Sequence, residues 1–332
     1  MRALLHLALG LAVSLACLYF ATRGSDWGEV RDTLLAAHSG WVLAAALAVA
    51  GALLARAWRW LRLLRPVSGA VRFGAALSAT AIGSAATAVV PLRLGELVRP
   101  VLLARRAGIG VTPVLATVVI ERLVDLLFIV LCFLWLSFVY PLPAAVSAAA
   151  RGLAVAGTAG LALLVLAQRH RATSERWLAA GLARLPARLA AAARPLVAGV
   201  LDGCKALADL RTVAVVCALS ALIWASAALV FLCALLALGV AAPLLPAALA
   251  SVVIVAAFIF LPQAPGYVGT WQAGCVLALD LFGVPQEQAV GYALLTWLLS
   301  MLVNVGAGGL FLARAGLTPR QVLGVRPADA GR

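Results

Sequence analysis

The chain has 332 residues, of which 65% are hydrophobic and only 11% are charged. Soluble domains have about 45–50% apolar and about 25% charged residues, so this composition excludes an ordinary soluble domain. The net charge of +14 does not indicate a nucleic-acid partner, because most basic residues lie between apolar runs long enough to cross a bilayer, where they orient the chain and meet anionic headgroups. We therefore expect an all-α polytopic membrane protein.

Residues 1–140 are predicted to form a first membrane repeat. Its elements are a span at 3–22, a polar interfacial segment at 25–38, a span at 41–63, an interrupted hairpin at 73–106 and a span at 112–139. The first run has no clear cleavage site, so we expect a retained span in place of a signal peptide. Pro91 predicts the break in the hairpin, because proline interrupts a helix.

The end of the second span is strongly basic. Its arginines are Arg56, Arg59, Arg62 and Arg65. We expect them to reach the headgroups, since long basic side chains extend along apolar surface to the interface. By the positive-inside rule this end is cytoplasmic, which also places the N-terminus in the cytoplasm.

Residues 141–316 are predicted to form a second membrane repeat, followed by a cytoplasmic tail at 317–332. The elements of the repeat are a span at 144–167, a basic cytoplasmic amphipathic segment at 168–211, a span at 212–238, an interrupted hairpin at 246–284 and a span at 288–313. The basic segment has leucines at helical spacing, which fits helices that lie on an anionic membrane surface. A cytosolic pair of helices that pack on each other explains the pattern equally well.

The two repeats are predicted to have opposite orientations in the membrane. Interrupted segments at corresponding positions of inverted repeats indicate the substrate site of a transporter. Hairpin arms of about 13–18 residues reach about 20–27 Å, past the middle of a ~30 Å hydrocarbon core. We therefore expect about eight spans, including two re-entrant hairpins whose breaks share a water-accessible hollow.

Ionisable residues concentrate around the first break. A charge at the centre of a membrane helix costs roughly 2.5–3.5 kcal/mol, so such residues usually face a bundle interior or a polar cavity. The predicted substrate-binding residues here are Arg93, Glu96, Arg99, Glu121, Arg122 and Asp125. The alternative is a structural network of ion pairs that holds the hairpin to the following helix, and the two roles are compatible.

The second break has no charged residue between Leu244 and Leu279. The predicted substrate-binding residues here are Gly266, Tyr267, Gly269 and Gln272. A helix that begins near Gly269 would present free N–H groups and the positive end of its dipole, which together receive a phosphate or a carboxylate. A plain tight bend explains the two glycines equally well.

The cysteines and histidines indicate neither a metal site nor a cofactor. The six cysteines are scattered without C-x-x-C spacing, and the three histidines form no cluster. We therefore expect the cysteines to act as small packing residues.

The motifs around the two breaks resemble the flippase-like transmembrane family. They are P-L-R-L-G-E-L-V-R-P, E-R-L-V-D and P-G-Y-V-G-T-W-Q. This family includes the membrane half of lysylphosphatidylglycerol synthases and hopanoid-associated membrane proteins. The resemblance covers about residues 5–315, and it implies an eight-span fold with two re-entrant hairpins that moves lipids between leaflets. By position, the six charged residues above match the first two motifs, and Gly266 and Gly269 match the third.

Two departures from the family pattern affect the expected activity. Gln272 stands where many members have Glu, which puts any charge-dependent step at that position in doubt. The chain also ends without the soluble aminoacyl-transfer domain of the synthases, so we do not expect it to make aminoacylated lipid.

The leading hypothesis is an integral lipid flippase or transporter of the bacterial inner membrane, without enzymatic activity and with both termini in the cytoplasm. Its partners would be membrane lipids with a polar or anionic headgroup. Arg93 and Arg99 would hold a phosphate, while Glu96, Glu121 and Asp125 would balance charge or carry protons. The alternatives are a membrane enzyme that uses the carboxylates as acid–base groups, and a non-transporting protein partner in lysylphosphatidylglycerol- or hopanoid-type lipid biosynthesis.

Overall fold

The computed structural model describes residues 2–90, 95–140, 144–183, 189–191, 198–199, 201–202, 204–259, 261, 263–318 and 321. Every regular element in these residues is a helix, which confirms the predicted all-helical class. The helices are α1 (Arg2–Thr22), α2 (Trp27–Leu35), α3 (Ser39–Leu64), α4 (Phe73–Val89), α5 (Gly95–Ala107), α6 (Val111–Val139), α7 (Ala144–Arg169), α8 (Arg171–Ala183), the 3-10 helix η2 (Cys204–Ala208), α10 (Leu210–Ala237), α11 (Leu244–Ile259), the 3-10 helix η3 (Pro265–Tyr267), α12 (Thr270–Asp280) and α13 (Gln286–Arg314).

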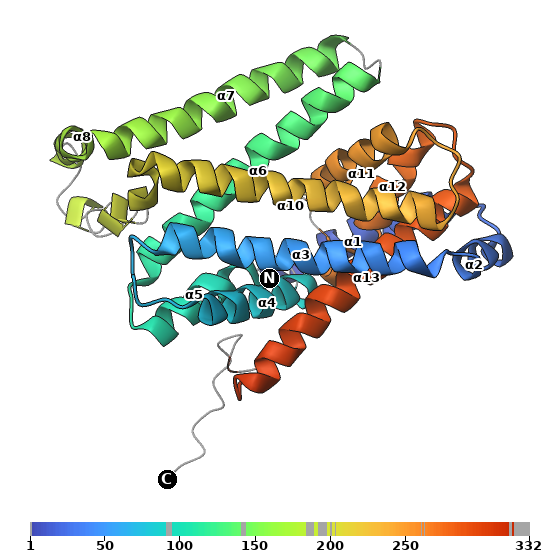
Figure 1. The fold of residues 1–332 in the computed structure, drawn as a ribbon, viewed down its shortest axis with the longest axis horizontal. Helices are drawn as coiled ribbons and strands as arrows, with labels where there is room; N and C mark the ends of the chain where they lie inside the picture. The colour runs from blue at the N-terminus through green and yellow to red at the C-terminus, as the bar shows by residue number, and fades with distance from the viewer. Residues whose placement is uncertain are drawn as a thin grey trace.

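Helices α3 and α10 form the centre of the bundle. They lie side by side over most of their length (Figure 1). Around the first half of α3, the largest apolar cluster packs α10, α11 and α13 together, with Phe231, Ala248 and Tyr292 among its members. Around the second half, Trp60 packs on α4, α5 and α6. Helix α3 therefore joins two separate parts of the core.

The first predicted hairpin is a pair of helices, α4 and α5, that pack antiparallel on each other. Gly95 faces Thr87, and Gly83 faces Arg99, so positions ascend along one helix as they descend along the other. A Cβ on either glycine would collide with the facing helix. The close approach of α4 and α5 therefore depends on residues without side chains.

The second predicted hairpin corresponds to α11 and α12, which also pack on each other and are separated by the short helix η3. At Gly274 of α12, an added Cβ would lie 3.0 Å from the Cα of Val255. The second predicted interruption is thus present, whereas the break predicted at Pro91 lies outside the described residues. The two arms of each pair lie in contact.

Among the described residues, three helices are long and apolar enough to cross a membrane, namely α3, α10 and α13. Helices α1 and α2 add a fourth span if they are counted together, with a bend of 83° between them. Helix α6 has 29 residues and is therefore about 43 Å long, which exceeds a ~30 Å hydrocarbon core. Helix α6 differs from the other long helices in the position of its charged residues, because Glu121, Arg122 and Asp125 lie near its middle, whereas the three arginines of α3 lie toward its end.

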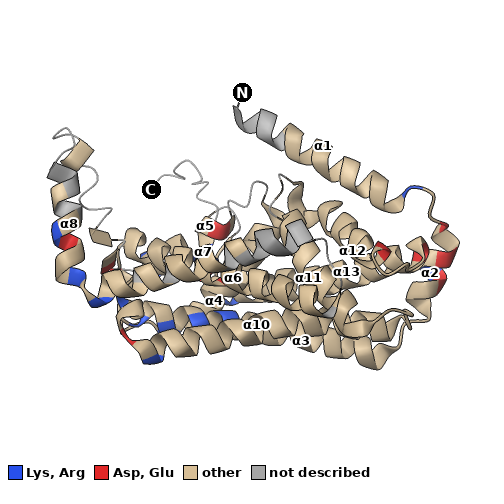
Figure 2. Ribbon diagram, turned by 90° about the horizontal axis from the view of Figure 1, so that it is seen from above, with Lys and Arg blue, Asp and Glu red and all other residues tan. Residues whose placement is uncertain are grey.

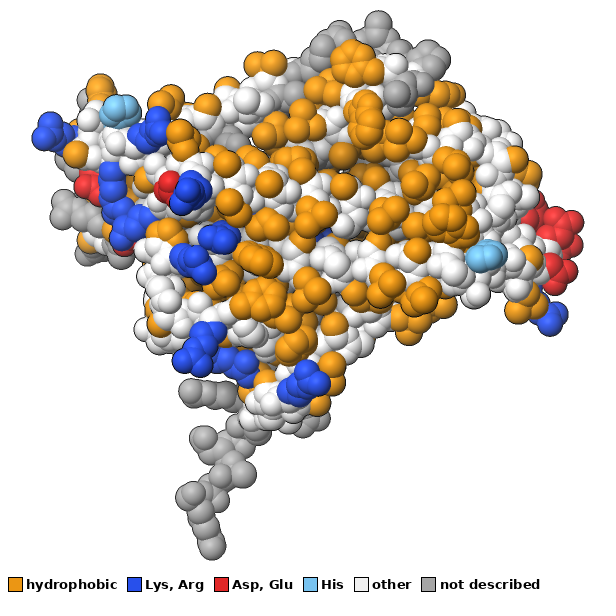
Figure 3. All heavy atoms as spheres, in the orientation of Figure 1, with side chains coloured by type: hydrophobic (Ala, Val, Ile, Leu, Met, Phe, Trp, Pro, Cys, Tyr) orange, Lys and Arg blue, Asp and Glu red, His pale blue; other side chains and the backbone are white. Residues whose placement is uncertain are grey.

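Charged residues gather at opposite ends of the bundle. Figure 2 shows Lys and Arg along the ends of α3 and α10 and near α8, while Asp and Glu gather on α2 at the other end. Between the two ends the surface is largely apolar (Figure 3). Leu47, Leu222 and Leu302, for example, are each more than half exposed. An apolar band between polar ends is the surface that a bilayer requires.

The basic segment 168–211 is described only in part, and that part does not follow either predicted arrangement completely. Helix α8 is mainly exposed and Trp177 is 76% exposed, as a helix on a membrane surface would be. In contrast, Cys204 and Leu207 of η2 are buried against Leu63 of α3 and Ile120 of α6. The end of the segment therefore belongs to the core of the bundle.

Candidate functional site

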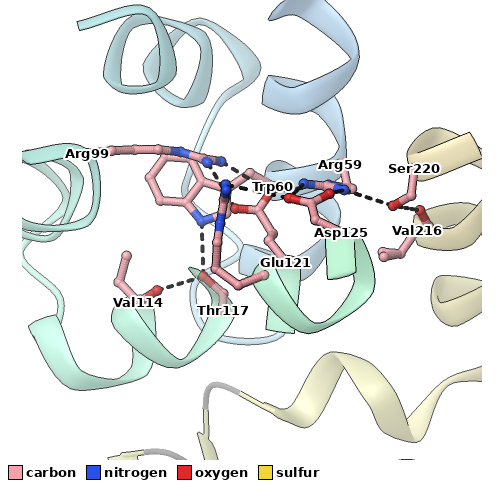
Figure 4. A network of polar contacts seen from close by, with 10 residues as sticks. Arg59, Trp60, Arg99, Val114, Thr117, Glu121, Asp125, Val216 and Ser220 are labelled. Atoms are coloured by element: carbon pink, nitrogen blue, oxygen red, sulfur yellow. Dashed lines mark hydrogen bonds and ion pairs between the residues drawn. The ribbon is translucent and has the colours of Figure 1, made fainter. Parts of the chain in front are cut away.

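Arg59 is the centre of a buried polar network on the inner face of α3 (Figure 4). Its side chain is 1% exposed. Nε donates a hydrogen bond to Glu121 Oε1 at 3.3 Å, and Nη1 donates to Asp125 Oδ1 at 2.6 Å and to Ser220 Oγ at 2.9 Å. Nη2 donates to Asp125 Oδ2 at 3.2 Å. One guanidinium group thereby joins α3 to α6 and to α10.

Glu121 also binds an arginine from α5. Arg99 donates from Nη1 to Glu121 Oε2 at 2.9 Å and from Nη2 to Oε1 at 3.4 Å. The Arg99 guanidinium stacks on Trp60, with its Cζ 3.8 Å from the ring centroid, and Trp60 Nε1 donates to Thr117 Oγ1 at 3.0 Å. The Glu121 side chain has no exposed area. A charge buried this completely is tolerated only when it is paired, and two arginines supply the pairing.

Asp125, Arg122 and Arg56 lie at the accessible edge of the network. The side chain of Asp125 is 14% exposed and that of Arg122 is 48% exposed, with Arg122 Nη2 3.6 Å from Asp125 Oδ2. Arg56 is partly exposed and interacts electrostatically with Asp125 and with Tyr267 of η3. An anion that approaches this edge would therefore meet the ion pair of Arg122 and Asp125, with Arg56 within electrostatic range of the same carboxylate.

The residues predicted around the first break lie at different depths. Arg93 lies outside the described residues, and Glu96 is partly exposed in the first turn of α5. The expectation that Glu121 lines a water-accessible hollow is not met, because Arg59 and Arg99 enclose its carboxylate. For Glu121 and Arg99, the structure corresponds to the alternative of an ion-pair network that holds the hairpin to the following helix.

The segment between α11 and α12, at the second break, is held in place by hydrogen bonds between uncharged groups. Gln272 is 2% exposed, and its Oε1 accepts a hydrogen bond from the Gly269 N–H at 2.7 Å. Thr270 Oγ1 donates to Gln263 Oε1 at 2.5 Å, and Gln263 Nε2 donates to the carbonyl of Ile259 at 2.7 Å. The start of α12 was predicted to present free N–H groups to an anion. The Gly269 N–H is not one of them, since the Gln272 side chain accepts its hydrogen bond, and anion binding by the rest of the first turn stays a prediction.

Both glycines of the second break adopt conformations that favour glycine. Gly266 has φ 78° and Gly269 has φ 86°, and Tyr267 between them has φ 59°. A Cβ on Gly269 would collide with the carbonyl of Ser14 on α1, and the Gly266 carbonyl accepts a hydrogen bond from Trp297 Nε1 of α13 at 2.6 Å. The tight bend is therefore held between α1 and α13.

The second break lies against the first helix pair. Helix η3 packs on α4, and a Cβ on Gly266 would lie 4.0 Å from the carbonyl oxygen of Ala88 in the last turn of α4. The interaction of Tyr267 with Arg56 connects the same region to the charged network. The second break is thus in contact with the first helix pair, and the water-accessible hollow predicted between the two breaks stays a prediction.

Comparison with known protein families assigns the chain to a family. A family model described as the lysylphosphatidylglycerol synthase TM region matches residues 7–308. The chain belongs to this family. Membership in the lysylphosphatidylglycerol synthase TM family confirms the resemblance seen in the motifs and indicates a membrane protein of lipid metabolism or transport. No curated protein matches the chain.

Sequence reasoning missed the central residue of the network in this member of the lysylphosphatidylglycerol synthase TM family. Arg59 was expected to reach the headgroups with its neighbours, but it is buried. A usable signal existed, because Glu121 and Asp125 lie deep in α6 and need a cation from another helix. Ser220 gave no signal, since a serine in an apolar helix usually bonds to its own backbone, as its Oγ also does to Val216 at 2.8 Å.

Proposed function

We propose that the chain is a lipid transporter that moves a polar lipid between the leaflets of the bacterial inner membrane. The observation that carries the proposal is the edge formed by Arg56, Arg122 and Asp125 beside Tyr267 of the second break. A headgroup phosphate that reaches this edge replaces one anionic partner of the arginines by another, so it is bound without leaving a charge unpaired. The family assignment supports lipid as the substrate class.

In this proposal the charged residues divide the work. Arg99 is engaged by Glu121 and Trp60, so the phosphate contacts pass to Arg56 and Arg122, with Arg93 of the first break as a further ligand. Asp125 and Glu96 balance the charge of the headgroup as it passes. Glu121 keeps α5 in place, and Gly266, Tyr267, Gly269 and Gln272 shape the facing wall of the path.

The proposed architecture has eight spans arranged as two inverted repeats, residues 1–140 and 141–316, with a cytoplasmic tail at 317–332. The order of elements supports it, since each half contains a long helix, a short one, a long one, a broken pair and a final long helix. We place the arginine-rich end of the bundle and both termini in the cytoplasm, according to the positive-inside rule. The first pair then opens to the cytoplasm and the second opens to the exterior.

Reconstituted liposomes test the transport function. The protein should accelerate the exchange of a fluorescent lipid between leaflets, measured by dithionite quenching, relative to empty liposomes across a panel of headgroups. Arg122→Gln should slow the exchange about tenfold, because a charge-assisted hydrogen bond contributes about 1.5–3 kcal/mol. Arg106→Gln, which neutralises an exposed arginine at the end of α5, should exchange lipid at the wild-type rate.

A different outcome would favour the second candidate function. The family is named for a region of a synthase, which supports a membrane partner of a lipid-modifying enzyme. Equal exchange in empty and protein-containing liposomes for every lipid in the panel, together with co-purification of such an enzyme, would establish that role. We propose no catalytic activity for the chain itself, and product formation from radiolabelled lipid by the purified protein would contradict this.

A further inference from the structure

A cavity of about 210 Å³ lies at the end of the bundle where α2 carries its acidic residues, opposite to the arginine-rich end. It is open to one side and is lined by the end of α1, the end of α12 and the start of α13. Its polar lining consists of Arg23, Asp280 and Gln286, and its apolar lining includes Phe20 and Val276. The volume is below the ~300–1,000 Å³ of pockets for drug-sized ligands, so the cavity can hold a small polar group but no acyl chain.

Opposite charges line this cavity without pairing with other described residues. The Arg23 guanidinium lies 5.9 Å from the centroid of the Phe20 ring, and neither Arg23 nor Asp280 forms an ion pair within the described part of the chain. Asp280 is the last residue of α12, where a negative charge is opposed by the helix dipole at a cost of about 0.3–1 kcal/mol. Stability of α12 therefore does not account for the carboxylate.

The backbone around Arg23 is anchored at the cavity. Gln286 Nε2 donates hydrogen bonds to the carbonyl of Arg23 at 2.9 Å and to that of Ala21 at 3.2 Å. These bonds connect the end of α1 to the start of α13. The backbone of Arg23 is thus fixed beside the cavity, and its side chain lines the cavity together with Asp280.

We propose that this cavity binds the headgroup of a lipid that carries both a phosphate and a primary amine. Arg23 binds the phosphate and Asp280 binds the ammonium group, so each charge of the ligand meets its opposite. A headgroup with only a phosphate would leave Asp280 unpaired beside a second anion, and one with only an amine would leave Arg23 unpaired.

The position of α1 provides room for the acyl chains. Figure 2 shows α1 standing away from most of the bundle, and its side chains Leu15 and Tyr19 are 64% and 62% exposed. Acyl chains can therefore lie along α1 within the bilayer while the headgroup occupies the cavity. The inference rests on the proposed function only in taking a lipid as the ligand.

Lipid competition on the full-length protein tests the assignment. Delipidated protein in detergent is incubated with equal amounts of phosphatidylethanolamine and phosphatidylglycerol of the same acyl chains, and the bound lipids are counted by native mass spectrometry. Phosphatidylethanolamine should be retained preferentially. Arg23→Gln and Asp280→Asn should each weaken its binding about tenfold, which corresponds to one charge-assisted hydrogen bond. In Asp280→Asn, phosphatidylglycerol should bind as well as phosphatidylethanolamine.

Matched controls and a soluble competitor complete the experiment. Arg31→Gln and Asp32→Asn change the same residue types on α2, at the same end of the bundle but outside the cavity, and should bind lipid as the wild type does. The proposal is overturned if the wild type retains both lipids equally, if the cavity variants match the controls, or if soluble phosphoethanolamine displaces the lipid at equal concentration. Because binding at equilibrium is measured, a failure here is distinguishable from an absence of leaflet exchange.

Discussion

The two broken helix pairs are held in the bundle by different kinds of contact. In the first pair, Arg99 of α5 binds the buried Glu121, which also binds Arg59 of α3. In the second pair, the contacts are neutral, and Gln272 and Trp297 supply two of them. The first pair therefore depends on complete pairing of charges, whereas the second depends on backbone shape and neutral hydrogen bonds.

This difference indicates which pair can respond to a charged ligand. A neutral hydrogen bond contributes about 0.5–1.5 kcal/mol, and an ionic headgroup does not compete for it strongly. An ion pair in apolar surroundings can exchange one anion for another at small cost but loses several kcal/mol when a partner is removed. We therefore expect the first pair to sense the charge of the substrate and the second to provide a fixed wall.

Removal of the Glu121 charge should have the largest effect on stability. Glu121→Gln leaves Arg59 and Arg99 without the carboxylate that joins them, and breaking a buried ion pair costs about 3–5 kcal/mol. We expect the free energy of unfolding in detergent micelles to fall by this amount, as measured by titration with a denaturing detergent.

The matched control is Glu175→Gln on α8. Glu175 pairs with Arg171 at 2.6 Å, but its side chain is 49% exposed, and exposed ion pairs contribute about 0–1 kcal/mol. If the two variants lose equal stability, the charged network does not hold the first pair and the contrast between the pairs is wrong.

The sequence predicted the helices better than it predicted their partners. Helix α3 was expected at 41–63 and is found at 39–64, because burial in lipid requires apolar runs whose length can be read directly. Which arginine of α3 turns inward could not be read in this way. Spacing places Arg56 and Arg59 on neighbouring faces, but only the packing of α6 and α10 against α3 determines that Arg59 is the buried one.

The candidate site shows the same limit. The order of the elements along the chain predicted that the two broken helix pairs lie near each other. The spacing of the charged motifs identified residues that lie in the charged network or beside it. The enclosure of Glu121 depends on contacts between helices that are distant in sequence, and no local pattern reports them. The capping role of Gln272, in contrast, follows from its place three residues after Gly269 and could have been predicted.

Substitution of Gly269 at the second break by alanine should give the next largest effect on stability. Gly269→Ala adds backbone strain at φ 86° and a collision with the carbonyl of Ser14, which together should lower the free energy of unfolding by about 2–4 kcal/mol. Gly283→Ala serves as the control, since Gly283 has φ 68° and no atom lies within 4 Å of an added Cβ, so this variant should lose only about 1–2 kcal/mol. Equal losses in the same denaturation experiment would show that the contact with α1 does not fix the second break.

The smallest effect is expected where ion pairs lie in water. Asp202 accepts a hydrogen bond from Arg171 Nη2 at 2.8 Å and lies 3.0 Å from Lys205 Nζ. The bond from the Arg171 guanidinium, and then that from the Lys205 ammonium, lower the pKa of the Asp202 carboxyl below its usual value. Because the carboxylate is half-exposed, this trio provides a comparison in water for the buried network of Glu121.

A lowered pKa in the folded state means that the trio contributes stability above the ordinary Asp pKa of about 3.9 and loses it as pH falls further. Attachment of Asp202 to Arg171 of α8 should therefore be unchanged between pH 7 and about pH 5 and should weaken below about pH 4. A carbon NMR titration of Asp-labelled protein in micelles, with Asp202→Asn to assign the signal, should place the Asp202 midpoint below that of a solvated aspartate. Arg171→Gln removes the stronger of the two bonds and should raise the Asp202 midpoint. If the midpoint does not move, this exposed pairing has no energetic effect. In that case the arginine–carboxylate contacts of this protein contribute to stability only where they are buried.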